Sequence, residues 1–521
     1  METARWTWKQ QLGSRLASGL IAVVLFTMAA CGGQSDPPAA ESDHSSPTAL
    51  PTALIFVTND GDGTVSVIEH GPNGNKVSKT LQIGSGNLGD MVITTEDHLF
   101  INVTDNNQVA AVDLVGTGTP SVRNFLPTGT RPVHGYRDPE GTRVWVLNDS
   151  DATVAPCKTA GPSGVATGSV TVIQNHDSGG GSTGGGGTGG GTGGGVTSGG
   201  TLGEVKKTIC VGRGHHKAAF SEPSAAHPNM PRRAFVSNIT DGTISVIENN
   251  LDRADCVDSM LAGCLPVIAT IDLCDPAKQS GGCDTLMTTA NGAVPHGLAF
   301  SPVSGKIYNA NVGYGTIAVI NPTAPIDPIT QTLPVETVID IGFANKAHIS
   351  PDGRFLIVKG TDTKSDVSHI HGKLTVISVA DNTFTTTDLL DIHPDGFEFT
   401  PDGKKLYVTT ATNADRITGL PTHPNQKNNL LLVFDTSNLP ALTGMKEIKV
   451  GVADGGHRAL AIHERDGKAR HVFVPNPHDG TVSVVDVEDD AVVDTITVGP
   501  DPGSIVVFGI ESHEDDEPSH H

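Results

Sequence analysis

The sequence predicts an all-β protein, and specifically a β-propeller, on three observations. One strand–loop–strand unit recurs along the chain, and its strands are rich in Val, Ile, Thr and Phe, which pack well on a half-buried pleated surface. Tight turns such as Ser350-Pro351-Asp352-Gly353 separate the units, and Pro followed by Asp-Gly is typical of hairpin turns. No long stretch after residue 50 has a helical hydrophobic period. Four-stranded units that repeat at this spacing are typical of propellers.

The repeat has a recognisable core, in which the loop often reads Asn-x-x-Asp-Gly-Thr and the second strand ends in Ser-Val-Ile or Ser-Val-Val. We count eight units, and seven is the alternative: Leu54–Glu69, Leu99–Leu114, Arg143–Gln174, Arg233–Glu248, Lys306–Ile320, Arg354–Val379, Lys405–Asp435 and His471–Val487. The last strand, Gly503–Phe508, has no hairpin after it, and the hairpin from Leu54 has no inner strand before it. We therefore predict that the two chain ends pair and close the ring, which occupies residues 53–510.

Short segments within the strands carry a family resemblance. Val57-Thr58-Asn59, Val236-Ser237-Asn238 and Tyr407-Val408-Thr409 resemble the YVTN repeats of lactonase-type propellers, over roughly residues 52–510. The resemblance implies the fold and leaves the function open.

The first 52 residues read as an export segment and a tether. Residues 1–30 combine a basic start at Arg5, Lys9 and Arg15 with a short apolar stretch, as signal peptides do. Met28-Ala29-Ala30-Cys31 resembles a bacterial lipobox, which implies a lipid on Cys31; a non-lipidated secretory signal is the alternative. Residues 31–52 are polar and rich in Ser, Pro and Ala, as a flexible tether is. The sequence therefore predicts an exported protein that a lipid anchors to a membrane of the cell envelope, on the periplasmic side. Gly32 and Gly33, in place of a retention Asp, favour the outer membrane.

Two insertions and a tail interrupt or extend the predicted ring. Residues 177–200 form a Gly-rich loop without core-forming residues, and residues 511–521 form an acidic, His-containing tail. Residues 250–290 form a Cys-rich insertion. Six of the seven cysteines follow Cys31, and in an exported chain an even number predicts disulfides whose pairing the sequence leaves open: Cys157, Cys210, Cys256, Cys264, Cys274 and Cys283.

The net charge of −23 makes nucleic acid an unsuitable partner, because phosphate binding requires basic clusters. An acidic surface favours solubility and would also orient a positively charged redox partner.

Histidines recur at one point of the repeat, although only 21 of the 521 residues are His. Six units place a histidine just ahead of the hairpin, in one case as a pair: His134, His215 with His216, His296, His348, His393 and His457. Asp90 and Ser504 stand near the equivalent place in the other two units. In a closed ring these side chains would surround one end of the central channel. For each histidine alone, a hydrogen bond near a turn is the alternative role, but clustered neutral imidazoles favour a metal site.

The order of these histidines, together with Pro295-His296-Gly297 and His393-Pro394, resembles the ligand set of the copper–sulfide cluster in nitrous oxide reductase. The resemblance implies that all seven bind a polynuclear, sulfide-bridged copper cluster that reduces N₂O to N₂. The chain departs from that family because it carries no cupredoxin domain, so a separate protein would have to donate the electrons. Lys217, Lys346 and Asp395 are candidate proton donors, with surface or turn roles as the alternative.

Three other functions remain open from the sequence. The first is a non-enzymatic envelope propeller that binds copper or a partner protein. The second is a propeller resembling the haem-d domain of bacterial nitrite reductases, which would favour eight blades. The third is a lactonase, which usually requires carboxylates around one cation, and the sequence offers no such set.

Overall fold

The computed structural model describes residues 51–114, 119–153, 155–159, 166–177, 201–250, 264–413, 422–454 and 458–510. The side chains of His215 and His216 lie outside that description, as do the predicted signal segment and nearly all of the tether. The chain divides into two units, Met1–Thr48 and Ala49–His521, and the second contains the described structure. No helix among the described residues is long and apolar enough to cross a membrane.

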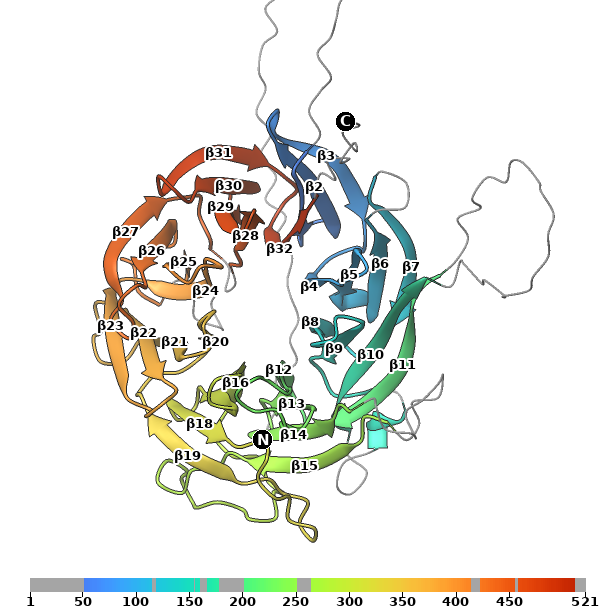
Figure 1. Ribbon diagram of the computed structural model, residues 1–521, viewed down its shortest axis with the longest axis vertical. Helices are drawn as coiled ribbons and strands as arrows, with labels where there is room; N and C mark the ends of the chain where they lie inside the picture. The colour runs from blue at the N-terminus through green and yellow to red at the C-terminus, as the bar shows by residue number, and fades with distance from the viewer. Residues whose placement is uncertain are drawn as a thin grey trace, which may run out of the picture. The chain divides into compact units, whose positions relative to one another are not determined.

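Eight four-stranded antiparallel sheets form the blades of a ring (Figure 1). The closure blade comprises, from the inside outward, β32 (Pro502–Gly509), β1 (Ala53–Asn59), β2 (Thr64–Gly71) and β3 (Gly74–Gln82). The other seven blades follow in chain order, also from the inside outward: β4 (Leu88–Ile93), β5 (His98–Val103), β6 (Gln108–Asp113), β7 (Ser121–Pro127); β8 (Pro132–Arg137), β9 (Arg143–Asn148), β10 (Gly168–Asp177), β11 (Leu202–Val211); β12 (His215–Ser221), β13 (Arg233–Asn238), β14 (Thr243–Glu248), β15 (Val267–Asp272); β16 (Pro295–Ser301), β17 (Lys306–Asn311), β18 (Thr316–Ile320), β19 (Val335–Asp340); β20 (Ala347–Ile349), β21 (Phe355–Asp362), β22 (His371–Ser378), β23 (Phe384–Leu390); β24 (His393–Phe399), β25 (Lys405–Ala411), β26 (Leu430–Asp435), β27 (Thr443–Lys449); β28 (Ala461–Arg465), β29 (Lys468–Asn476), β30 (Thr481–Asp486) and β31 (Ala491–Thr497). Two short 3₁₀ turns, Thr104–Asn106 and Cys157–Thr159, lie in the connections.

The predicted propeller is confirmed, and the count of eight blades is correct. The predicted closure is also confirmed, because β1 pairs antiparallel with β32 from Ala53 opposite Gly509 to Asn59 opposite Pro502. The pairing removes two sheet edges that would otherwise expose unpaired backbone groups.

The loop pattern Asn-x-x-Asp-Gly-Thr has a structural reason. The buried Asn238 amide donates to Thr243 Oγ1 and to Ser245 Oγ, both at 3.0 Å, and so links two strands across their hairpin. Gly242 adopts a φ of +73°, in the left-handed region that favours glycine. The same pattern recurs at Asn476, which donates to Thr481 Oγ1 at 2.9 Å and Ser483 Oγ at 3.0 Å.

The sheet order fixes which residues share an end of the ring. Within each antiparallel blade the outermost strand ends where the innermost strand began, so the next innermost strand starts on the same face. We call this the start face, and the opposite one the end face. The eight innermost strands, β4, β8, β12, β16, β20, β24, β28 and β32, enclose the central channel (Figure 1).

Apolar side chains between neighbouring blades form the core. At the seam between the last blade and the closure blade, for example, Ile55, Ile68, Phe473 and Val484 are fully buried. Disulfides reinforce the connections, as the even cysteine count predicts: Cys157 bonds Cys210, Cys274 bonds Cys283, and Cys264 is also disulfide-bonded.

Candidate functional site in the central channel

The innermost strands place four of the seven predicted ligands at the start face of the channel. His134 lies in β8, His296 in β16, His348 in β20 and His393 in β24, each within the first three residues of its strand. His215 and His216 begin β12, and of these two the structure describes only the backbone; His457 lies outside the described residues. The predicted position in the repeat is therefore confirmed for these strands, whereas the ligand role stays a prediction.

Backbone irregularities occur in β8, β12, β16 and β24, close to the histidines of these four strands. The pairing register shifts between Pro132 and His134, between His215 and Ala218, between Pro295 and Gly297, and between Pro394 and Phe397. Such bulges redirect side chains and are frequent beside functional sites. The sequence signal was the Pro or Gly next to each histidine.

His134 forms an ion pair across two blades. Its Nδ1 lies 3.0 Å from Asp90 Oδ2 on β4, and the Gly135 N–H donates to the same oxygen at 3.3 Å. Burial would raise the pKa of Asp90, but His134 and Lys217 outweigh it and hold that pKa below its usual range. In its own blade, Asp90 occupies the position that a histidine occupies in other blades. It therefore serves as the partner of His134 in the next blade.

A buried ionic network joins three further blades. The side chain of Asp395 is 1% exposed and accepts from Lys359 Nζ at 2.6 Å, from Lys346 Nζ at 3.2 Å and from the Arg458 backbone N–H. Lys359 also donates to the Pro394 carbonyl at 2.9 Å, and burial lowers its pKa to about 8 although Asp395 opposes that shift. The surface interpretation of Asp395 was therefore wrong. Lys359 was missed because it reads as one polar residue inside an apolar strand.

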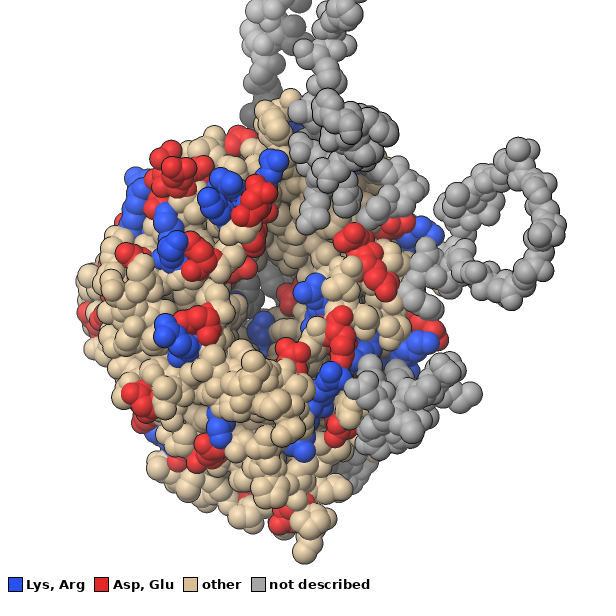
Figure 2. All heavy atoms as spheres, in the orientation of Figure 1, with Lys and Arg blue, Asp and Glu red and all other residues tan. Residues whose placement is uncertain are grey.

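Burial and neighbouring cations favour the neutral form of two further channel histidines, His296 and His348. Desolvation is the largest cause that lowers the pKa of His296 to about 2 and that of His348 to about 3. The ammonium groups of Lys217, Lys346 and Lys359 lower both values further. The side chain of His348 is exposed, so solvent can reach it. Basic and acidic side chains are visible around the hollow at the centre of the ring (Figure 2).

Within the parts of the chain that the structure describes, the four channel histidines do not form a compact ligand set. Only one group of three or more His, Cys, Asp or Glu side chains there brings its ligand atoms within 4.8 Å of one another, and it comprises His70, His463 and His471. Sequence analysis missed this group, because nothing in the repeat relates residue 70 to residues 463 and 471. His393 instead contacts Thr361 Oγ1 through Nδ1 at 2.8 Å.

Comparisons with known proteins support the fold. No family model matches the chain, and no curated protein does. Among solved structures, the chain is similar to the dihydro-heme d1 dehydrogenase NirN in complex with DHE, at 12% identity and a TM-score of 0.52 over 90% of this chain and 78% of that one. It is also similar to AztD from Citrobacter koseri, at 12% identity and a TM-score of 0.50 over 88% of this chain and 99% of that one. A putative 6-phosphogluconolactonase from Bacteroides uniformis matches at 13% identity and a TM-score of 0.45, over 88% of this chain and all of that one. At these identities the likeness establishes a β-propeller and no more.

Proposed function

We propose that this protein is an exported binding propeller whose central channel holds an anionic ligand at the start face. One feature carries the proposal: the ammonium groups of Lys346 and Lys359 both contact the single buried carboxylate of Asp395, at 3.2 and 2.6 Å, so this part of the channel wall keeps a net positive charge. Together with Lys217, these groups act on the imidazoles of His296 and His348. Ammonium groups attract carboxylates and phosphates, while neutral imidazoles supply a hydrogen-bond donor and a lone pair.

The same charges bear on the copper-cluster hypothesis. A polynuclear copper centre is cationic, so nearby ammonium groups oppose its binding by Coulomb repulsion. The hypothesis, and N₂O reduction with it, then depends on His215, His216 and His457, whose side chains are not described. It stays a prediction, as do the separate electron donor and the envelope location.

A carboxylate-bearing tetrapyrrole is the second candidate, and it would combine both features of the site. An iron tetrapyrrole takes a neutral imidazole as axial ligand, and its carboxylates would face the ammonium groups. Two observations favour it: the ring has eight blades, and NirN, with which it shares the fold, is described in complex with DHE.

Binding of anionic probes to the full-length protein tests the proposal. We expect citrate or haemin to bind with an affinity that Lys217→Gln lowers roughly tenfold or more, because a hydrogen bond to a charged group contributes about 1.5–3 kcal/mol. Lys404→Gln is the matched control, since that exposed ammonium pairs only with Asp402 on a surface turn. A soret shift with haemin that His348→Ala abolishes would identify the tetrapyrrole.

The same preparation tests the rival. Anaerobic protein that binds several equivalents of copper with sulfide, and converts N₂O to N₂ under strong reduction, would overturn the anion proposal. His296→Ala should then lower both copper content and turnover. Probe affinities that do not change in Lys217→Gln would also refute our assignment.

A further inference from the structure

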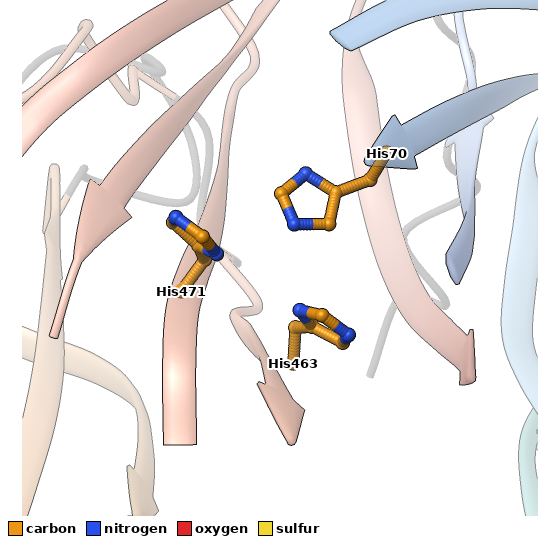
Figure 3. Close-up of side chains that lie close together, drawn as sticks. All are labelled: His70, His463 and His471. Atoms are coloured by element: carbon orange, nitrogen blue, oxygen red, sulfur yellow. The ribbon is translucent and has the colours of Figure 1, made fainter. Parts of the chain in front are cut away.

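Three histidines meet at the seam between the first and last parts of the chain, away from the channel site. His70 lies near the end of β2 in the closure blade, whereas His463 and His471 face each other in the paired strands β28 and β29 of the last blade. Their rings point toward one another in Figure 3, and one ligand atom from each lies within 4.8 Å of the others. From these positions we propose that His70, His463 and His471 bind a first-row divalent cation, zinc foremost, that clamps the two blades where the ring closes.

The strand directions place this seam site near the end face. β2 and β28 both run from the start face to the end face, and His70 lies near the end of β2 while His463 lies in the middle of β28. His471 lies in β29, which runs antiparallel to β28, and it pairs directly with His463. The site is thus separate from His134, His296, His348 and His393, which lie at the beginnings of innermost strands.

Burial makes the seam unusual for three uncoordinated imidazoles. His70 is 7% exposed and His463 is 3% exposed, while the side chain of His471 is a quarter exposed. The Phe473 ring packs edge-on against His70 at 5.3 Å between centroids. The partly open His471 gives an ion and a water molecule access from solvent, while His70 and His463 are buried.

Hydrogen bonding leaves ring nitrogens available for a metal. Nδ1 of His70 lies 2.6 Å from Asn75 Oδ1, and the Asn75 amide in turn donates to Asp494 Oδ2 at 2.8 Å, which fixes the amide orientation. Nδ1 of His70 therefore carries the proton and Nε2 keeps its lone pair. The Nδ1 atoms of His463 and His471 are buried without a hydrogen-bond partner in the described structure. An outer-shell carbonyl that fixes a histidine tautomer is typical of metal ligands.

The chemistry fits zinc with one open position. Neutral imidazole suits zinc and copper, and three histidines with a water molecule complete a tetrahedron. Zinc–nitrogen bonds of about 2.0–2.1 Å place the nitrogens roughly 3.4 Å apart, so small ring rotations suffice to close the set.

Zinc binding to the full-length protein tests the site. After chelation and reloading, we expect the wild type to retain one equivalent of Zn²⁺ more than His463→Gln or His471→Gln, and its Tm to rise on zinc addition. Neither variant should show this rise. His478→Gln is the matched control, because that exposed histidine pairs with Asp454 at the surface. Asn75→Ala should weaken zinc binding about 10–100-fold without removing it, as loss of an outer-shell partner does.

Cobalt substitution supplies a second readout that does not depend on stability. Co²⁺-loaded wild type should show the intense visible absorption of a tetrahedral site, and His463→Gln should lose it while its circular dichroism stays native. Equal zinc content in the wild type and in a folded His463→Gln variant would overturn the proposal. A Tm rise that persists in both seam variants would overturn it too, since the ion would then act elsewhere.

Discussion

The two histidine groups of this propeller differ in how they are built. The channel histidines occupy equivalent positions in successive repeats, and two of them have hydrogen-bonding partners that partly explain them, the Asp90 carboxylate at His134 and Thr361 at His393. The seam histidines occupy no equivalent positions, yet their ligand atoms come within 4.8 Å of one another. Recurrence in a repeat therefore identifies a shared location in the ring, whereas convergence of ligands depends on how neighbouring blades pack.

The two regions also differ in charge. In the channel, burial and the ammonium groups of Lys217, Lys346 and Lys359 lower the pKa values of His296 and His348, whereas His134 pairs with Asp90. At the seam, burial lowers the pKa of His463, and His70, His471, Arg465 and Arg470 lower it further, while Asp486 lies 3.9 Å from Nε2 of His471. Cationic neighbours are thus present in both regions, and the seam differs because its ligand atoms converge and a carboxylate lies close to them.

The largest expected effect on stability concerns the ionic network around Asp395. Asp395→Ala should lower the free energy of unfolding by about 3–5 kcal/mol, because it leaves the buried Lys359 ammonium without its counter-charge. Urea denaturation followed by circular dichroism measures it. Asp388→Ala is the control, since that carboxylate is half exposed where it pairs with Lys373. Equal losses in the two variants would mean that the network is not a special support of the channel.

The next effect contrasts one histidine from each group in metal-free protein. His134→Leu should cost about 1–3 kcal/mol, because it leaves the Asp90 carboxylate without its partner. His463→Leu should be neutral or stabilising by about 1 kcal/mol, since it removes a buried Nδ1 that has no partner. Chemical denaturation in chelator gives both values. A large loss of stability in His463→Leu would contradict this expectation and would show that His463 stabilises the seam without a metal.

A smaller effect concerns the pH dependence of the channel wall. Glu398 lies on the innermost strand β24, where desolvation raises its pKa from 4.5 to about 7. Since the folded pKa exceeds the unfolded one, the stability that this group contributes is present below pH 4.5 and is lost as the pH rises through 7. Glu398→Gln should therefore leave stability nearly unchanged at pH 4 and increase it at pH 8. Melting curves across this range measure the difference, and parallel curves for wild type and variant would contradict it.

The smallest effect concerns the Gly-rich connection. The β10–β11 pairing extends to Asp177 opposite Leu202, so the ends of this loop are already held together. Shortening residues 180–198 by half should change the free energy of unfolding by no more than about 0.6 kcal/mol. Ligand affinity in the channel and zinc content at the seam should both stay constant. A loss of channel affinity or of seam zinc would show that the loop contributes to that site.

Much of the fold followed from local chemistry. The pattern Asn-x-x-Asp-Gly-Thr marked the hairpins because its Asn amide links two strands and its Gly takes a positive φ, both within one repeat. The unpaired halves at Leu54 and Gly503 predicted the closure, because edge strands require partners. The channel histidines were placed correctly along their strands for the same reason, since a strand start is a local feature.

What the sequence determined by itself was therefore the propeller, its eight repeats, its closure and the class of residue at the head of each innermost strand. Only the tertiary structure decided which polar groups meet. Lys359 and Asp395 come from strands of different blades, and His70 lies roughly 400 positions before its two partners at the seam. These contacts depend on side-chain direction and on blade packing, which no local sequence pattern encodes. They decide where a buried charge has a partner and where an ion fits.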